Sequence, residues 1–173
     1  MNRTKSKCRT RRAVLPNGFT LMELLIVMAI ITILMLLAIP TFSALRRQGN
    51  RLSAIKSMQA IQEAETMYAS NYPTNGYACT LSALGGDSSA GVPSPTAAQL
   101  LKADITSGFK DGYNFAITNC TKVTASGTDR ITSYTITAVP QTVGKTGDSG
   151  FCGDDSSIKS DPAGGTNCTQ LVQ

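Results

Sequence analysis

The sequence predicts an α+β fold in which one long N-terminal helix packs on a small antiparallel β-sheet. The first half of the helix is predicted by residues 24–45, an apolar stretch without a charge, and the second half by an amphipathic stretch that ends near residue 72. The sheet is predicted by two runs of alternating polar and apolar residues, 113–118 and 134–139. With 173 residues, of which 42% are hydrophobic and 16% charged, we expect one compact core with an appendage.

The composition argues against catalysis. The chain contains no His and no Trp, which excludes His-based catalytic triads and His-containing zinc sites. It also has no Gly-rich phosphate loop and no nucleophile with a base beside it in the sequence. We therefore predict a protein that is not an enzyme and that uses no cofactor and no metal.

Basic residues are concentrated at the N-terminus. The first 18 positions hold six of them and no acidic residue, at Arg3, Lys5, Lys7, Arg9, Arg11 and Arg12. The other 155 residues carry ten basic and eleven acidic side chains, so the formal charge of +5 becomes −1 without the first 18 residues. A chain of that charge, without a cluster of basic and aromatic residues, is not expected to bind nucleic acid.

The uncharged stretch, residues 24–45, is long enough to span a bilayer as a helix, which needs about 20 residues. The cations before it predict that the N-terminus stays in the cytoplasm and that the chain after residue 45 lies outside. Two ordinary interpretations are a secretory signal peptide and a plain membrane anchor. The first lacks a good small-x-small cleavage site after the stretch. The second leaves Glu23 unexplained, since a charge at the centre of a membrane helix costs about 2.5–3.5 kcal/mol.

A third interpretation rests on residues 18–25, GFTLMELL, which closely resemble the prepilin motif of type IV pilins and type II secretion pseudopilins. The resemblance covers a basic leader, Gly18 before the cleavage point, Phe19 after it, Glu23 as the fifth mature residue and Pro40 as the twenty-second. It implies that a prepilin peptidase cuts after Gly18 and that the new amino group of Phe19 is N-methylated. It also implies a type IV pilin-like fold.

The residue types of the motif suit these roles. Gly18 has no Cβ, so a peptidase can approach its backbone closely in an extended form. Glu23 is tolerated in a membrane when a cation neutralises it, and cleavage creates one in the amino group of Phe19, on the same chain or on a neighbouring chain. We favour the neighbouring chain, where the ion pair sets the register of assembly. Pro40 lacks an N–H and is expected to kink the helix.

The two halves of the helix are expected to lie in different environments. Residues 19–45 form the half that lies in the membrane or in the core of a filament. Residues 46–72 form an amphipathic half with a stripe of core residues, namely Ala54, Met58, Ile61, Tyr68 and Tyr72. Glu65 interrupts this stripe.

Residues 73–173 are expected to form a globular head. A connecting loop over residues 82–95 leads to a short helix over residues 95–103, with Pro in its first turn. After the predicted hairpin, two more short strands are expected near residues 150–152 and 157–159.

The five cysteines divide between two compartments. Cys8 lies in the leader, while the other four are exported, and an even number in a small extracytoplasmic domain implies disulfides. Four cysteines allow three pairings, and the sequence does not choose among them. We prefer the pairing of Cys79 with Cys120 and of Cys152 with Cys168.

Four aspartates near the C-terminus, Asp148, Asp154, Asp155 and Asp161, offer oxygen ligands of the kind that Ca²⁺ prefers. Their order does not match an EF-hand loop. We interpret them as turn and surface carboxylates rather than as a metal site.

These predictions describe a structural subunit of a type IV pilus-like filament. The resemblance implies a precursor in the bacterial inner membrane that is cleaved, methylated and polymerised through its N-terminal helix. The expected partners are further copies of the chain in a helical homopolymer, the prepilin peptidase and methyltransferase, and an inner-membrane assembly platform. The mature protein is expected in a surface pilus. Two alternatives stay open: a type II secretion pseudopilin in a periplasmic pseudopilus, and a membrane-tethered or minor-pilin binding protein.

Overall fold

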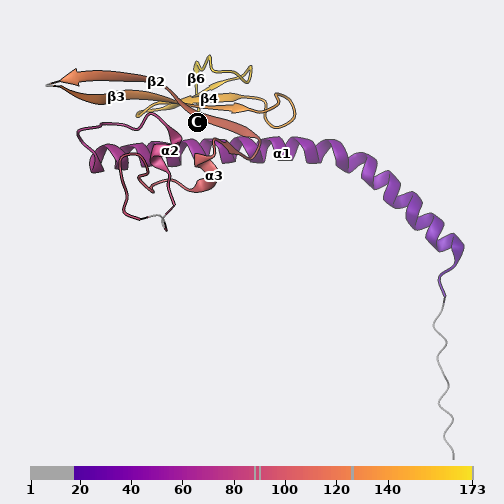
Figure 1. Cartoon of the computed structure of the whole chain (residues 1–173). Helices are drawn as coiled ribbons and strands as arrows, with labels where there is room; N and C mark the ends of the chain where they lie inside the picture. The colour runs from indigo at the N-terminus through magenta and orange to yellow at the C-terminus, as the bar shows by residue number, and fades with distance from the viewer. Residues whose placement is uncertain (1–17, 88, 90, 126, 173) are drawn as a thin grey trace, which may run out of the picture. The chain divides into compact units, whose positions relative to one another are not determined.

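The computed structural model describes residues 18–87, 89, 91–125 and 127–172, with the side chains of residues 37–41 and 125 left out of the description. Its helices are α1 (Leu21–Asn71), α2 (Leu81–Leu84) and α3 (Ala103–Thr106). Its strands are β1 (Phe109–Lys110), β2 (Tyr113–Ala125), β3 (Thr128–Pro140), β4 (Gly150–Gly153), β5 (Ile158–Asp161) and β6 (Gln170–Leu171). One long helix and a sheet confirm the α+β class (Figure 1).

The described chain divides into two units between residues 39 and 40, and helix α1 contributes to both. The described part of the first unit is the start of α1 and the three residues before it. The second unit is the head, which contains the rest of α1, the short helices and the sheet.

The six strands follow one another in the sheet in chain order, and each pair of neighbours is antiparallel. The predicted hairpin is confirmed and is longer than expected, because β2 and β3 have 13 residues each. Its register pairs Phe115 with Ala138 and Ile117 with Ile136, and it shifts at a bulge between Thr118 and Thr121. The strands expected near residues 150–152 and 157–159 are β4 and β5.

The head buries its core between the second half of α1 and one face of the sheet. From α1, Met58 and Ile61 are completely buried, and Tyr68 is nearly so. From the sheet, alternate residues of β3, among them Ile136 and Ala138, are buried, as a strand with one covered face requires. The predicted stripe on α1 is therefore core, with Tyr72 at its partly buried end.

The prediction of a short helix over residues 95–103 is wrong. The described backbone there is irregular, and the helices lie on either side of it, α2 before it and α3 after it. Tertiary contacts explain the difference, since the N–H groups of Ala98 and Leu101 donate to the carbonyl oxygens of Ala83 and Leu84. Both residues are buried in the core. These tertiary contacts outweigh the preference of the local sequence for a helix.

The segment after α1 turns sharply at the predicted break. Gly76 has φ of +76°, and a Cβ at this position would lie 2.0 Å from the carbonyl oxygen of Ile131, so only glycine fits. Beyond this turn, a disulfide joins Cys79 to Cys120 of β2, and a second joins Cys152 of β4 to Cys168. These are the pairs preferred from the sequence.

No helix in the described part of the chain is both long enough and apolar enough to cross a membrane. The predicted span, residues 24–45, includes residues 37–41, whose side chains lie outside the description. The predicted kink rests on Pro40, which is one of those residues. Both the span and the kink stay predictions.

Candidate functional site

The proposed cleavage point lies in exposed, non-helical backbone. Gly18, Phe19 and Thr20 precede the first helical residue, Leu21, and all four are exposed. A Cβ added to Gly18 would meet no atom within 4 Å, and the side chain of Phe19 is 87% exposed. The peptide bond between Gly18 and Phe19 therefore lies in exposed backbone outside helix α1.

Thr20 and Glu23 form a reciprocal cap at the start of α1. The backbone N–H of Glu23 donates to Oγ1 of Thr20 at 3.2 Å, and the backbone N–H and the hydroxyl of Thr20 both donate to Oε2 of Glu23 at 3.0 Å. This is the capping-box arrangement, which satisfies N–H groups that a helix leaves free at its N-terminus. It holds the carboxylate of Glu23 against the residue that follows Phe19.

The role of Thr20 was missed in the sequence, although a signal for it exists. Ser or Thr followed three residues later by Glu, just before an apolar run, is the pattern of a capping box. Thr20 and Glu23 fit that pattern immediately before the apolar stretch.

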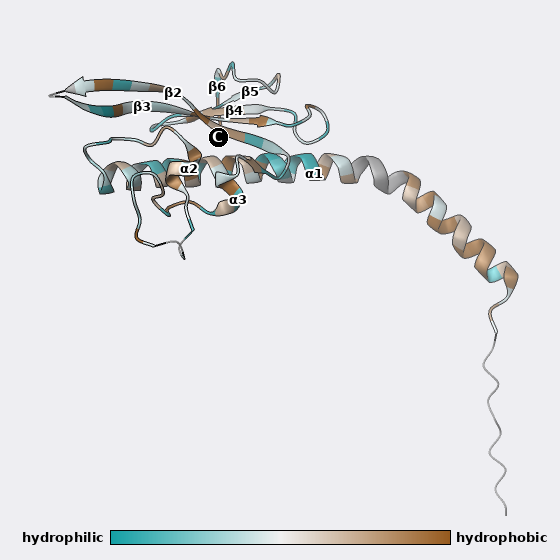
Figure 2. Ribbon diagram, in the orientation of Figure 1, coloured by the Kyte–Doolittle hydropathy of each residue, from teal (hydrophilic) through white to brown (hydrophobic). Residues whose placement is uncertain are grey.

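The helix that begins at this cap exposes an almost continuous apolar surface over residues 21–36 (Figure 2). Large apolar side chains there are between 43% and 82% exposed, with Ile31 and Leu21 at the two limits. The hydroxyl of Thr32 donates to the carbonyl oxygen of Met28 at 2.8 Å, so this polar side chain is satisfied within the helix. Such a surface is stable only in lipid or against another apolar surface.

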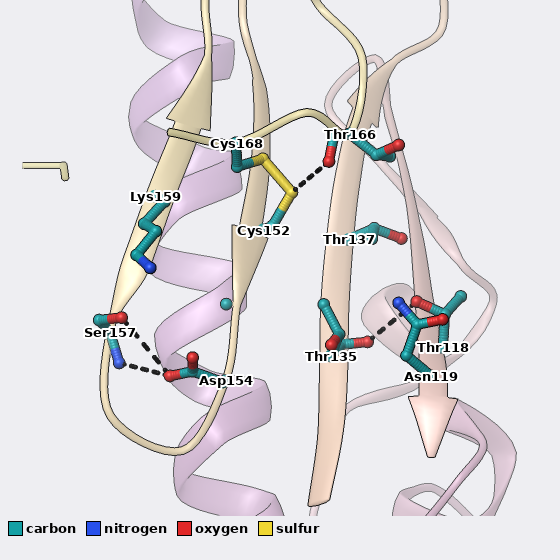
Figure 3. A pocket seen from close by; sticks show the side chains of 11 residues that line it. Thr118, Asn119, Thr135, Thr137, Cys152, Asp154, Ser157, Lys159, Thr166 and Cys168 are labelled. Carbon is teal, nitrogen blue, oxygen red and sulfur yellow. Dashed lines mark hydrogen bonds between the residues drawn. A yellow bond between two sulfur atoms is a disulfide. The ribbon is translucent and has the colours of Figure 1, made fainter. Parts of the chain in front are cut away.

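The head carries a shallow polar groove of about 490 Å³ on the sheet face turned away from α1 (Figure 3). Hydroxyl groups of β2 and β3, including those of Thr118 and Thr135, line one side. The disulfide of Cys152 and the turn at Asp154 line the other. The groove offers surface hydrogen-bonding groups, with no His in the chain to act as a base.

The four aspartates considered as calcium ligands bond to groups of the chain itself or lie in turns. The carboxylate of Asp154 accepts hydrogen bonds from Ser156 and Ser157, and these bonds, above all that of the Ser156 hydroxyl, hold its pKa below the usual value. Asp148 forms a salt bridge with Arg47. In the described part of the chain, no group of three or more Cys, Asp or Glu residues could hold a metal ion.

Comparison with known proteins identifies the N-terminal segment. Residues 16–39 match the family model of the prokaryotic N-terminal methylation motif, so the chain carries the prepilin signature of type IV pilins and pseudopilins. No curated protein and no solved structure gives a significant match. The motif implies processing by a prepilin peptidase and assembly into a filament, and it is common to pili and to type II secretion pseudopili. Proteins with this motif are structural rather than enzymatic.

Proposed function

We propose that this protein is the structural subunit of a type IV pilus-like filament. The precursor inserts into the inner membrane with its N-terminus in the cytoplasm, is cleaved after Gly18 and is N-methylated at Phe19. Subunits then leave the membrane and polymerise through the apolar half of α1. The observation that carries the proposal is the methylation motif of residues 16–39 followed by an exposed apolar helix.

Cleavage after Gly18 is supported by local geometry. The bond lies in exposed backbone just before the helix, and the Thr20 cap marks where the helix begins. A cut at this bond leaves the cap intact, because neither Thr20 nor Glu23 belongs to the leader. The mature chain therefore keeps its helix cap at Thr20, the residue next to the new N-terminal residue, Phe19.

Assembly is supported by the exposed surface of residues 21–36 and by the position of Glu23. Burying apolar surface gains about 25 cal/mol per Å², and contact between identical stripes supplies it once a subunit leaves lipid. A head-to-tail contact of this kind does not close on itself and so produces an open filament. The carboxylate of Glu23, at the exposed end of the helix, is the group that the methylated amino group of a neighbouring Phe19 would neutralise.

Replacing Glu23 by Gln tests this proposal. The amide keeps the shape and an acceptor for the cap but removes the charge, so we expect cleavage to continue while filament yield falls at least about tenfold. Glu63→Gln, the same change at an exposed position of α1 in the head, should leave the yield unchanged. Thr20→Val removes the capping hydroxyl and keeps the Glu23 charge, so it should reduce the yield less than Glu23→Gln.

Normal filament yield from Glu23→Gln would contradict the role of the charge. A loss from Thr20→Val as large as that from Glu23→Gln would show that assembly depends on the cap as much as on the charge, and would contradict the leading role given to the charge.

A type II secretion pseudopilin is the second candidate, because the motif fits it equally well. The two disulfides of the head fit both candidates, because the periplasm and the cell exterior are both oxidising. The location of the mature protein separates the two candidates, since a pseudopilus stays in the cell envelope.

A further inference from the structure

Glu65 is a carboxyl group buried in the apolar core of the head. It lies on the core face of α1 and is 0% exposed. Its Oε2 accepts a hydrogen bond from the backbone N–H of Ala78 at 2.7 Å, whereas its Oε1 is buried and has no hydrogen-bond partner. A charged carboxylate in such a place costs several kcal/mol, so the neutral form is favoured.

The bond to Ala78 ties α1 to a segment that is also attached to the sheet. In residues 75–79, the N–H of Tyr77 donates to the carbonyl oxygen of Ile131 at 3.1 Å, and the N–H of Ile131 donates to Asn75 at 2.8 Å. The ring of Tyr77 packs edge-on against that of Tyr134, with 4.8 Å between the ring centroids. The disulfide of Cys79 anchors the end of the segment. Residues 75–79 therefore connect helix, sheet and disulfide around one carboxyl group.

Among the described residues, no cation neutralises Glu65. On α1 its titratable neighbour is Tyr68, whose hydroxyl donates to the carbonyl oxygen of Pro95. On β3 it is Tyr134, whose hydroxyl is buried without a hydrogen-bond partner and whose pKa is raised by burial and then by Glu65. Tyr77 and the carboxylates of Asp154 and Asp155 act on Tyr134 in the same direction. No salt bridge in the described part of the chain includes Glu65.

We propose that Glu65 is a proton-operated latch, which holds residues 75–79 between α1 and β3 while its carboxyl group is neutral and releases them when the proton is lost. Release requires only local movement, because the disulfide keeps Cys79 next to β2. The latch does not depend on the filament function, since all of its parts lie within the head.

The direction of the pH effect follows from linkage. Burial raises the pKa of Glu65 to about 8 and outweighs the hydrogen bond from Ala78, which acts in the opposite direction, while a carboxyl group exposed by release has the ordinary value of 4.5. Between these two values the released state loses a proton that the closed state keeps, so higher pH favours release. One proton limits the effect to about tenfold per pH unit, and the effect levels off above about pH 8.

Hydrogen exchange at the Ala78 amide tests the latch in the full-length chain in detergent micelles. The protection factor, which is corrected for the intrinsic pH dependence of exchange, is measured from pH 5 to pH 8 for the wild type, Glu65→Gln and Glu63→Gln. We expect protection in the wild type to fall with pH by up to about tenfold per unit. Glu65→Gln should give a flat profile, and Glu63→Gln, an exposed neighbour on the same helix, should follow the wild type.

Parallel profiles for the wild type and Glu65→Gln would overturn the proposal. Infrared spectroscopy of the wild type supplies a test that does not need the variant to fold. A carboxylic acid C=O band should be present at pH 6.5 and lost above about pH 8, where Glu65 ionises. Absence of that band at pH 6.5 would also overturn the latch.

Discussion

The two halves of helix α1 differ in the exposure of their apolar side chains. In its first half Ile30 and Leu34 are 51% and 60% exposed, whereas in its second half Met58 and Ile61 are completely buried. The second half finds its partner in the sheet of the same chain. The first half has no partner in the described part of the chain. The difference separates residues that determine how the head folds from residues that we assign to lipid and then to other subunits.

The largest effect expected in the first region is the loss of processing in Gly18→Val. A branched side chain obstructs the close approach of the peptidase to the backbone, so the full-length precursor should accumulate in the membrane fraction. Intact mass and immunoblotting of that fraction measure it. Gly49→Val is the matched control, because Gly49 is also exposed and has no atom within 4 Å of its Cβ position. Efficient cleavage of Gly18→Val would show that the peptidase does not require glycine at this position.

In the second region, the disulfides are expected to contribute most to stability. The chain-entropy model gives about 4 kcal/mol for the 41-residue separation of Cys79 and Cys120, and about 3 kcal/mol for the 16-residue separation of Cys152 and Cys168. Each pair is replaced by alanines, and the free energy of unfolding is measured with urea. A larger loss for the shorter loop would contradict this order.

One substitution on each half of α1 tests whether the second half stabilises the head while the first half serves assembly. Met58→Ala leaves a cavity in the core and should lower the unfolding free energy of the head by about 3 kcal/mol. Ile30→Ala should change it by less than about 0.5 kcal/mol and should instead lower filament yield. Urea unfolding and sheared filament yield are measured for both variants. Equal destabilisation of the head by the two substitutions would contradict the division of the helix.

The smallest effect is expected at the turn between β4 and β5. Asp154→Ala removes the acceptor of the Ser156 and Ser157 bonds and should cost about 1 kcal/mol, whereas Asp155→Ala should cost almost nothing. Because the pKa of Asp154 is lowered in the folded state, its contribution is present above the ordinary value of 3.8. It is lost as pH falls further, so the two variants should converge with the wild type in acid. A constant difference down to pH 2 would contradict this.

Sequence patterns predicted the elements whose local signals agree with their packing. The stripe through Met58 and the alternating runs of the hairpin each gave the correct element and the correct buried face. Residues 95–103 were mistaken for a helix because their backbone bonds go to Ala83 and Leu84, which are distant in the sequence. Glu65 looked like an interruption of the core, since nothing local reveals that the Ala78 N–H lies opposite its carboxyl group.

The candidate site was predictable for a different reason. Gly18, Phe19 and Glu23 lie within the matched segment, residues 16–39, and a short motif of this kind can be recognised without the rest of the fold. Their roles in cleavage, methylation and assembly stay predictions. The Thr20 cap has an equally local pattern. The partner of the apolar helix is outside the chain, so neither sequence pattern nor the fold of one subunit supplies its geometry.

The most direct test of the filament account is the N-terminal sequence and intact mass of the protein in a fraction sheared from the surface of its native cells. The account predicts a chain that begins at N-methylated Phe19 and whose mass is lower by four hydrogens, as two disulfides require. A surface form that begins elsewhere, or a Phe19 form found only in the cell envelope, would contradict it.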